Sequence, residues 1–258
     1  MDTGTRLRMF WRSLFLQACW NYERMQSLGF AYCLEPWLES LHEDDPQAVR
    51  DAMRRHLEYF NTQPYMASFV LGVIARLEED LANAPAGKRA AIEARIGAVK
   101  RSFGASLAGI GDAVFWGALK PGCAALAILA ALVLWTLRVP HAVPLALAVY
   151  LATYNIPALW VRWEGLGMGY EEGDAGVAME LKRFRWQERL RRLRWTGLGM
   201  TAALVAAGLL VSPWGDQGPL VHLGAFAAGL CVRPLGYPSP RLYAVVVAGG
   251  VLAALAGA

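Results

Sequence analysis

The chain has 258 residues, of which 56% are hydrophobic and only 18% charged, and its mean hydropathy is +0.31. Because soluble domains carry about a quarter charged residues, this composition favours an integral membrane protein over a soluble one. The formal net charge is +4. An excess of Lys and Arg is typical of the cytoplasmic side of membrane spans, so we expect no nucleic-acid partner.

The first expected element is a helix over residues 14–38, in which polar side chains are set among aromatic and apolar ones. Gln17, Asn21 and Arg24 are spaced i, i+4 and i+7 and would share one face beside Trp20. Polar groups at membrane depth are costly and need partners. This face therefore predicts packing against another subunit, a water-filled vestibule or contact with a polar ligand such as a sugar.

Two apolar segments that follow, 59–75 and 102–122, are interrupted by Pro, Gly, Asn and Asp. Pro64 disfavours a helical conformation at Gln63 and frees backbone groups there. Interrupted segments of this kind point to a transporter's binding site, so both are predicted to be re-entrant hairpins. The alternative is a Pro-kinked amphipathic helix on the membrane surface. Asp112 is predicted to be a functional carboxylate, a helix N-cap, or both at once.

The rest of the chain is rich in uncharged stretches of the length that a membrane span requires. There are 17 uncharged residues between Lys120 and Arg138, and 23 between Arg138 and Arg162. We predict about five transmembrane helices, at 121–137, 142–161, 196–212, 219–232 and 242–258.

A basic segment, 162–195, separates the second predicted span from the third. Its later part, 178–195, has the pattern of an amphipathic helix on the cytoplasmic membrane surface. With this segment in the cytoplasm, the N-terminus is predicted to be cytoplasmic as well. The sequence thus predicts an all-α, multi-pass membrane protein in four regions: 1–120 with the interrupted segments, 121–161 with two spans, 162–195, and 196–258 with the remaining spans.

Motifs that would indicate an enzyme are absent from the sequence. It contains no GxSxG, P-loop or HExxH motif, and its four histidines are isolated. The four cysteines are scattered without metal-ligand spacing. We therefore expect no catalytic residues, no metal site and no cofactor.

Four long segments occur in a characteristic order: "FLQACWNYERMQSLGFAYCLEPWL", "RRHLEYFNTQPYMASFVLGVIARLEED", "LAGIGDAVFWGALKPG" and "YNIPALWVRWEGLGMGYEEG". Together they resemble the IID subunit of the mannose/fructose/sorbose family of the bacterial phosphotransferase system. The resemblance covers roughly residues 8–174.

The resemblance implies a non-catalytic subunit that pairs with a IIC subunit in the bacterial inner membrane, as an oligomer of IIC–IID pairs in the lipid bilayer. The pair would form the path for a mannose-type hexose, which a soluble IIB component, supplied by IIA, phosphorylates as it enters. The alternative is a regulatory or sensory membrane subunit of an incomplete system that does not transport. The residues expected to line the sugar path or the IIC contact are Trp20, Asn21, Glu23, Arg24, Gln26, Asn61, Thr62 and Asp112.

Overall fold

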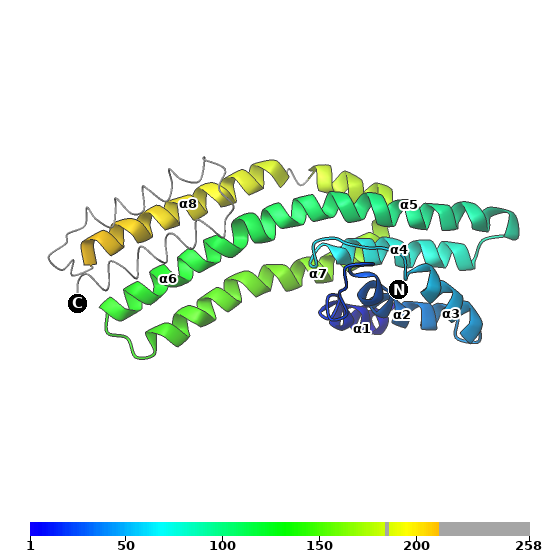
Figure 1. The fold of residues 1–258 in the computed structure, drawn as a ribbon, viewed down its shortest axis with the longest axis horizontal. Coiled ribbons are helices and arrows are strands. Elements are labelled where there is room, and N and C mark those ends of the chain that lie inside the picture. The colour runs from blue at the N-terminus through cyan, green and yellow to red at the C-terminus, as the bar shows by residue number, and fades with distance from the viewer. Residues whose placement is uncertain (184–185, 212–258) are drawn as a thin grey trace. The chain divides into compact units, whose positions relative to one another are not determined.

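The structure is a computed structural model that describes residues 1–183 and 186–211. The chain divides into two units, Met1–Ala202 and Ala203–Ala258, and all contacts discussed here lie within the first. The regular elements of the described residues are helices (Figure 1). They are α1 (Thr3–Ser13), α2 (Ser27–Leu41), α3 (Pro46–Arg55), α4 (Ala67–Ala82), α5 (Ala86–Gly111), the π-helix η1 (Asp112–Leu119), α6 (Lys120–Thr136), α7 (Ala142–Arg183) and α8 (Trp186–Val211).

Two of the short N-terminal helices begin at aspartates that cap them. The Oδ1 of Asp2 accepts a hydrogen bond from the backbone N–H of Thr5 at 2.9 Å. Asp45 accepts from two backbone N–H groups of the first turn of α3, each at 3.0 Å. Pro46 follows it at the first helical position, where proline's missing N–H is not needed.

The prediction of one helix over residues 14–38 is wrong for the first half of that range. α2 begins only at Ser27, and the chain before it forms turns. The Oδ1 of Asn21 accepts hydrogen bonds from the backbone N–H groups of Glu23 and Arg24, at 3.1 and 2.8 Å. Such local side-chain bonds compete with helix formation. The polar face predicted for this helix therefore does not form.

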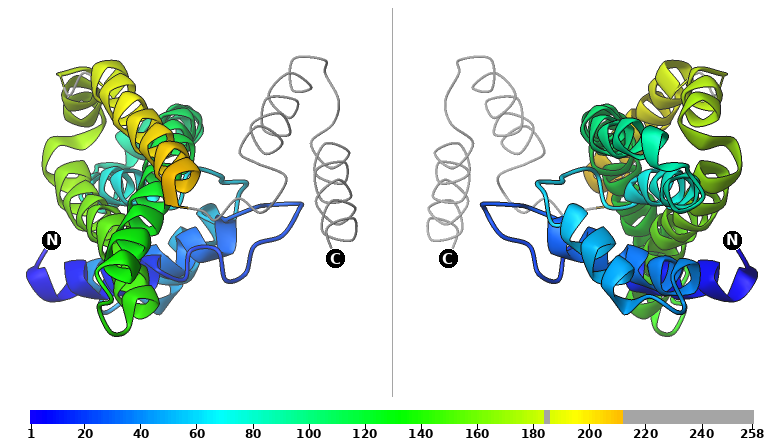
Figure 2. Two further views of the ribbon diagram at one scale, coloured as in Figure 1. Left: turned by 90° about the vertical axis from the view of Figure 1, so that its left-hand side faces the viewer. Right: turned by 90° about the vertical axis from the view of Figure 1, so that its right-hand side faces the viewer.

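The packing of α4 against α7 forms the centre of the first unit (Figure 2). Most of α4 is buried, and glycines allow the two backbones to approach closely. A Cβ on Gly72 would lie 2.3 Å from the carbonyl oxygen of Leu166, and one on Gly169 would lie 2.4 Å from that of Phe69. Small residues at a helix–helix contact are typical of membrane proteins.

The hairpin predicted for residues 102–122 is wrong, because α5, η1 and α6 follow one another as one long helical run (Figure 1). Two of its glycines, Gly104 and Gly111, allow close packing against the loop before α4 instead of a chain reversal. A Cβ on Gly111 would lie 2.6 Å from the Cβ of Gln63, in the loop before α4. The other interrupted segment, 59–75, turns through this loop and then enters α4.

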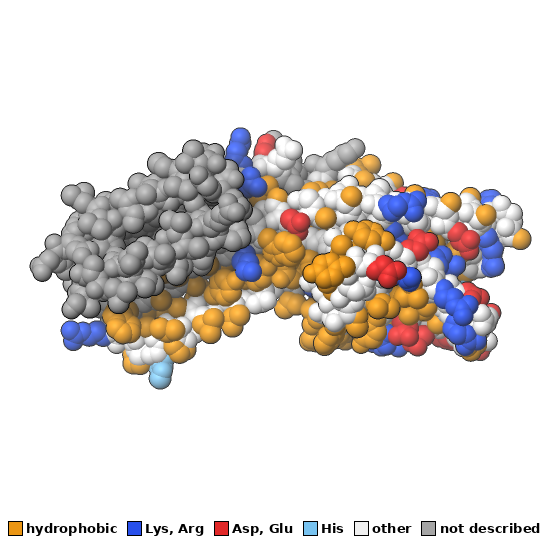
Figure 3. Space-filling view, viewed as in Figure 1, with side chains coloured by type: hydrophobic (Ala, Val, Ile, Leu, Met, Phe, Trp, Pro, Cys, Tyr) orange, Lys and Arg blue, Asp and Glu red, His pale blue; other side chains and the backbone are white. Residues whose placement is uncertain are grey.

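Two helical stretches are long and apolar enough to cross a membrane, Ala86–Thr136 and Ala142–Leu181. Their apolar ends, α6 and the first part of α7, coincide with the predicted spans 121–137 and 142–161. Hydrophobic side chains line the part of the first half of α7 that Figure 3 leaves uncovered, whereas charged side chains gather over α3, α4 and the start of α5 (Figure 3). α7 continues well beyond the predicted span, with one non-helical residue at Gly173.

The predicted amphipathic helix 178–195 is not a separate element. Its first residues end α7 at Arg183, and its last residues open α8 at Trp186. α8 then runs on to Val211 and so contains most of the predicted span 196–212. The predicted spans 219–232 and 242–258 lie outside the described residues.

Candidate functional site

The loop before α2 and the loop before α4 lie side by side, and we call residues 14–26 and 56–66 the paired loops. The backbone N–H of Gln26 donates to the carbonyl of Phe60 at 2.8 Å, and Met25 and Phe60 form an isolated parallel bridge. Two segments far apart in sequence are thereby held in a fixed register.

The first of the paired loops presents an aromatic pair at its turn. Asn21 closes the turn through its side chain, and the rings of Trp20 and Tyr22 meet edge to face with centroids 4.7 Å apart. Trp20 is 41% exposed and Tyr22 86% exposed. Glu23 and Arg24, both exposed, form an ion pair at 3.5 Å. Exposed rings beside charged groups can stack on a sugar or insert into a partner.

Gln26 and Thr62 tie the two loops together from the inside. The amide of Gln26 donates to the carbonyl of Thr62 at 2.8 Å and accepts from its N–H at 3.0 Å. Both residues are buried. The side chain of Gln26 thus makes the pair of hydrogen bonds to the second loop that a neighbouring strand backbone would make. This role is structural.

The second loop packs on the helical run of α5 and η1, in which Asp112 lies. The carbonyl of Asn61 would lie 3.3 Å from a Cβ on Gly104, and the side chain of Gln63 lies against Gly111. Asp112 is exposed and is the first residue of η1. π-helical stretches inside long helices frequently occur at functional sites.

The structure places the eight predicted site residues on the paired loops and on the helix that the second loop contacts. Seven of them (Trp20, Asn21, Glu23, Arg24, Gln26, Asn61 and Thr62) lie on the paired loops, and Asp112 lies on the helix that the second loop contacts. In the described part of the chain, Asp112 makes no hydrogen bond or ion pair to the loops.

Besides the Nδ1 of His56, three buried polar atoms of this region have no hydrogen-bond partner in the described residues. They are the Oγ of Ser27, the Oγ1 of Thr62 and the Nε2 of Gln63. Buried polar groups are nearly always paired, so each unpaired group needs an explanation. Ser27 and Gln63 were not predicted as site residues. In the sequence, the position of Gln63 before Pro64 could have indicated a role at the site. No sequence feature singles out Ser27.

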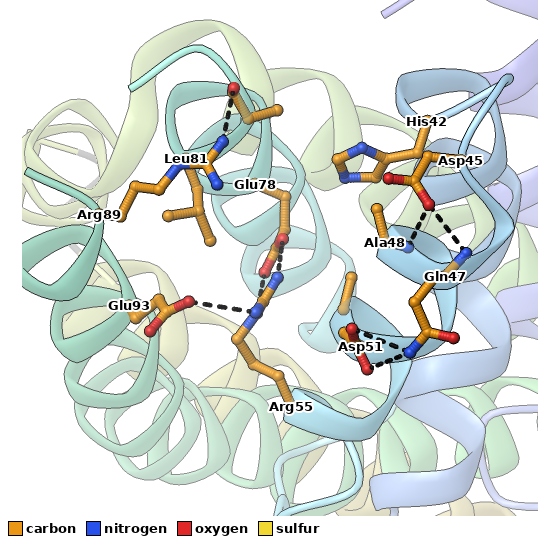
Figure 4. Close-up of a pocket in the computed structure, with 12 residues that line it drawn as sticks. His42, Asp45, Gln47, Ala48, Asp51, Arg55, Glu78, Leu81, Arg89 and Glu93 are labelled. Carbon is orange, nitrogen blue, oxygen red and sulfur yellow. Dashed lines mark hydrogen bonds and ion pairs between the residues drawn. The ribbon is translucent and has the colours of Figure 1, made fainter. Parts of the chain in front are cut away.

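A charged pocket of about 300 Å³ lies between α3, α4 and the start of α5 (Figure 4). Arg55 makes two hydrogen bonds to the carboxylate of Glu78, at 2.9 and 2.8 Å, and a longer contact of 3.4 Å to Glu93. The Nε2 of His56 lies 2.9 Å from the same carboxylate. Glu78 is only 1% exposed, so its buried carboxylate joins α4 to the end of α3, and Arg55 extends the contacts to α5 through Glu93.

The pKa values of this cluster follow from burial and hydrogen bonding. Burial alone would raise the pKa of Glu78, but hydrogen bonds from His56 and Arg55 outweigh it and lower the pKa to about 2. Burial lowers the pKa of His56, against the opposing effect of Glu78. His56 is then neutral at pH 7 and donates from Nε2 to an ionised Glu78.

The paired loops carry groups that are suited to binding. No group of three or more His, Cys, Asp or Glu side chains in the described residues is arranged to hold a metal ion. The paired loops offer amide, hydroxyl, carboxylate and aromatic groups, and these recognise a polar ligand or a partner through hydrogen bonds and ring contacts.

These features define the class of the protein: it is an all-helical membrane protein whose apolar helices extend from a packed polar region. Residues 1–212 match the sequence model of a protein family, the IID component of the mannose/fructose/sorbose family of the phosphotransferase system. The chain belongs to this family, as the sequence motifs predicted.

Curated relatives agree with the family model. The chain is 36% identical over 165 residues to the mannose-specific EIID component of Escherichia coli K12, over 64% of this chain and 54% of the relative. It is 34% identical over 208 residues to the fructose permease IID component of Bacillus subtilis, over 80% of this chain and 68% of the relative. The chain thus spans about half the length of the mannose-specific relative.

Two solved structures are similar to this one. A chain described as a membrane protein aligns with a TM-score of 0.72 at 26% identity, covering 99% of this chain and 96% of that chain. A chain of the mannose transporter ManYZ in complex with microcin E492 aligns with a TM-score of 0.57 at 27% identity, covering 100% and 96%.

Proposed function

We propose that this chain is the IID membrane subunit of a phosphoenolpyruvate-dependent sugar permease. With a IIC subunit it would form the path of a mannose-type hexose, which the IIB component phosphorylates as it enters. The chain itself would take no part in phosphoryl transfer. Family membership supports this proposal, and so does the name of the similar transporter ManYZ.

The observation that carries the proposal is the polar surface of the paired loops beside the π-helical start at Asp112. Unpartnered hydroxyl and amide groups lie beneath this surface, and an exposed aromatic pair lies at its edge. A hydroxyl-rich sugar, or the backbone of a partner subunit, would supply the hydrogen bonds that buried polar atoms require.

The predicted placement in the membrane is part of the same proposal. We place the chain as a multi-pass protein in the bacterial inner membrane, with a cytoplasmic N-terminus and an assembly of IIC–IID pairs. The distribution of Lys and Arg supports this orientation. The division into regions 1–120, 121–161, 162–195 and 196–258 stays a prediction.

The test is co-expression of the full chain with its candidate IIC partner, followed by binding of labelled mannose, fructose and sorbose to the purified complex. We expect saturable binding of one sugar that requires both chains. A complex that binds none of the three would favour the regulatory alternative, and failure to form a complex would refute the pairing.

Two variants test the surface itself. Asp112→Asn should weaken sugar binding about ten-fold or more, because a hydrogen bond to a charged group contributes about 1.5–3 kcal/mol. Asp44→Asn, an exposed aspartate in the turn between α2 and α3, is the matched control and should bind normally. Equal sugar binding by both variants, with the complex intact, would show that Asp112 does not line the sugar path.

A further inference from the structure

A second pocket lies on the opposite side of α4 from the charged cluster, between α4, η1 and α7. Its volume is about 240 Å³, and apolar side chains such as Phe69, Val114, Leu119 and Met168 form most of its wall. A space this size would hold about eight waters at roughly 30 Å³ each, but each water needs two or more polar partners. An apolar molecule suits such a wall better.

The pocket lies where the apolar surface of the α6–α7 pair gives way to charged residues. On α7, Ile156, Leu159 and Trp160 are exposed at 66%, 40% and 58%. Trp160 lines the pocket, and Glu164 follows it one helical turn later. Exposed tryptophan at the boundary between apolar and charged surface is typical of the membrane–water interface.

The pocket has a carboxylate at its edge. Within the described residues, its charged lining groups are Glu164 and Glu180, and Glu180 already interacts with another group of the chain. Glu164 is half-buried, and no hydrogen bond or ion pair of the described chain involves it. An apolar pocket with a carboxylate and an indole ring at its edge is complementary to a molecule with a hydrocarbon chain and a cationic head.

We propose that this pocket binds one acyl chain of a phospholipid whose head group carries a primary ammonium, which Glu164 binds at the membrane–water interface. The chain fills the space between Phe69 and Val114, and the ammonium lies between the carboxylate and the ring of Trp160. A lipid with a neutral glycerol head group would fill the same apolar space without the ion pair.

The test uses the full chain co-expressed with its IIC partner and reconstituted in vesicles. The vesicles contain either phosphatidylethanolamine or phosphatidylglycerol with a photoreactive diazirine in the acyl chain. Cross-linked peptides are mapped by mass spectrometry. We expect labelling on residues 114–119 and 157–168, and roughly five-fold more with the ethanolamine lipid than with the glycerol lipid.

Variants separate the head-group contact from the apolar space. Glu164→Gln should bring the ratio of the two lipids close to one, while Glu171→Gln, an exposed carboxylate of the same helix outside this pocket, should leave it unchanged. Val114→Trp fills the space and should reduce labelling by both lipids. The sugar-binding assay is independent of these readouts, so the lipid site and the transport proposal can fail separately.

Three results would overturn the proposal. One is equal labelling of the unaltered protein by the two lipids. Another is labelling spread evenly along the exposed face of α6 and α7, and the third is a cross-link from the pocket to the IIC chain in place of lipid. The last result would identify the pocket as part of the subunit interface.

Discussion

The buried carboxylate of Glu78 offers the sharpest quantitative prediction. Its pKa is about 2 in the folded protein, against an ordinary value of 4.5. Each pKa unit corresponds to about 1.36 kcal/mol, so the ionised carboxylate stabilises the fold by about 3 kcal/mol. Glu78→Gln keeps the shape but removes the charge. We expect it to lower the free energy of unfolding by about that amount, near the range for breaking one partner of a buried pair.

The same difference in pKa determines how the stabilisation by Glu78 depends on pH. Because the pKa is lower in the folded state, the stabilisation is fully present above about pH 4.5 and is lost as the pH falls toward 2. The gap between the unaltered protein and Glu78→Gln should therefore be constant between pH 5 and 7 and shrink below pH 4.5.

Thermal unfolding of the purified protein in detergent, followed by tryptophan fluorescence, measures this gap. A loss of about 3 kcal/mol corresponds to roughly 6–12 °C in Tm for a chain of this size class. Glu93→Gln is the matched control, because Glu93 contacts the same Arg55 at 3.4 Å but is about half exposed, so we expect a loss below about 1 kcal/mol. Equal Tm values for the two variants at pH 7, or a gap at pH 3 as large as the gap at pH 7, would refute the reasoning.

Three further substitutions test the packing around the paired loops. Gly29→Ala should prevent stable folding, because its Cβ would lie 1.9 Å from the carbonyl oxygen of Leu16; Gly87→Ala, with nothing within 4 Å, should accumulate normally. Gln26→Ala removes two buried hydrogen bonds and should cost about 2–4 kcal/mol in unfolding free energy. Trp37→Phe removes a 2.8 Å bond from the indole to α4 and should lower the unfolding free energy by about 1–2 kcal/mol. Normal Tm values would contradict the last two.

The hydrophobic pattern predicted the apolar helices because the bilayer, and not tertiary packing, determines their length and composition. The uncharged stretches at 121–137 and 142–161 match α6 and the start of α7, since a continuous apolar helix is the solution that satisfies every backbone group at membrane depth. The end of α7 was not predictable in this way. It carries charged residues as far as Arg183, and its continuation as a helix depends on tertiary contacts with α4.

Glycine and polar residues misled the prediction wherever tertiary contacts decided their role. The glycines of 102–122 suggested a break, but at Gly111 the missing side chain makes room for Gln63. Likewise, the spacing of Gln17, Asn21 and Arg24 fits a helix face, but the side chain of Asn21 bonds to the backbone of its own turn. Sequence spacing carries no information on which backbone approaches a glycine.

The four segments that carry the family resemblance contact one another in the structure. Gln26 of the first binds the backbone of Thr62 in the second, Gln63 of the second lies against Gly111 in the third, and Gly72 of the second packs against the fourth. Mutual packing therefore accounts for the buried amide of Gln26 and the backbone of Thr62 without any ligand, whereas the hydroxyl of Thr62 stays unpaired in the described residues.

The sugar hypothesis consequently concentrates on the exposed members of the predicted site. Trp20, Asn61 and Asp112 are exposed, so their substitution should change binding while leaving the unfolding temperature nearly unaltered. Gln26→Ala should instead change both together. A substitution at Asn61 could instead destabilise the chain as much as Gln26→Ala does. That result would show that these residues stabilise the fold and that the sugar binds elsewhere in the complex.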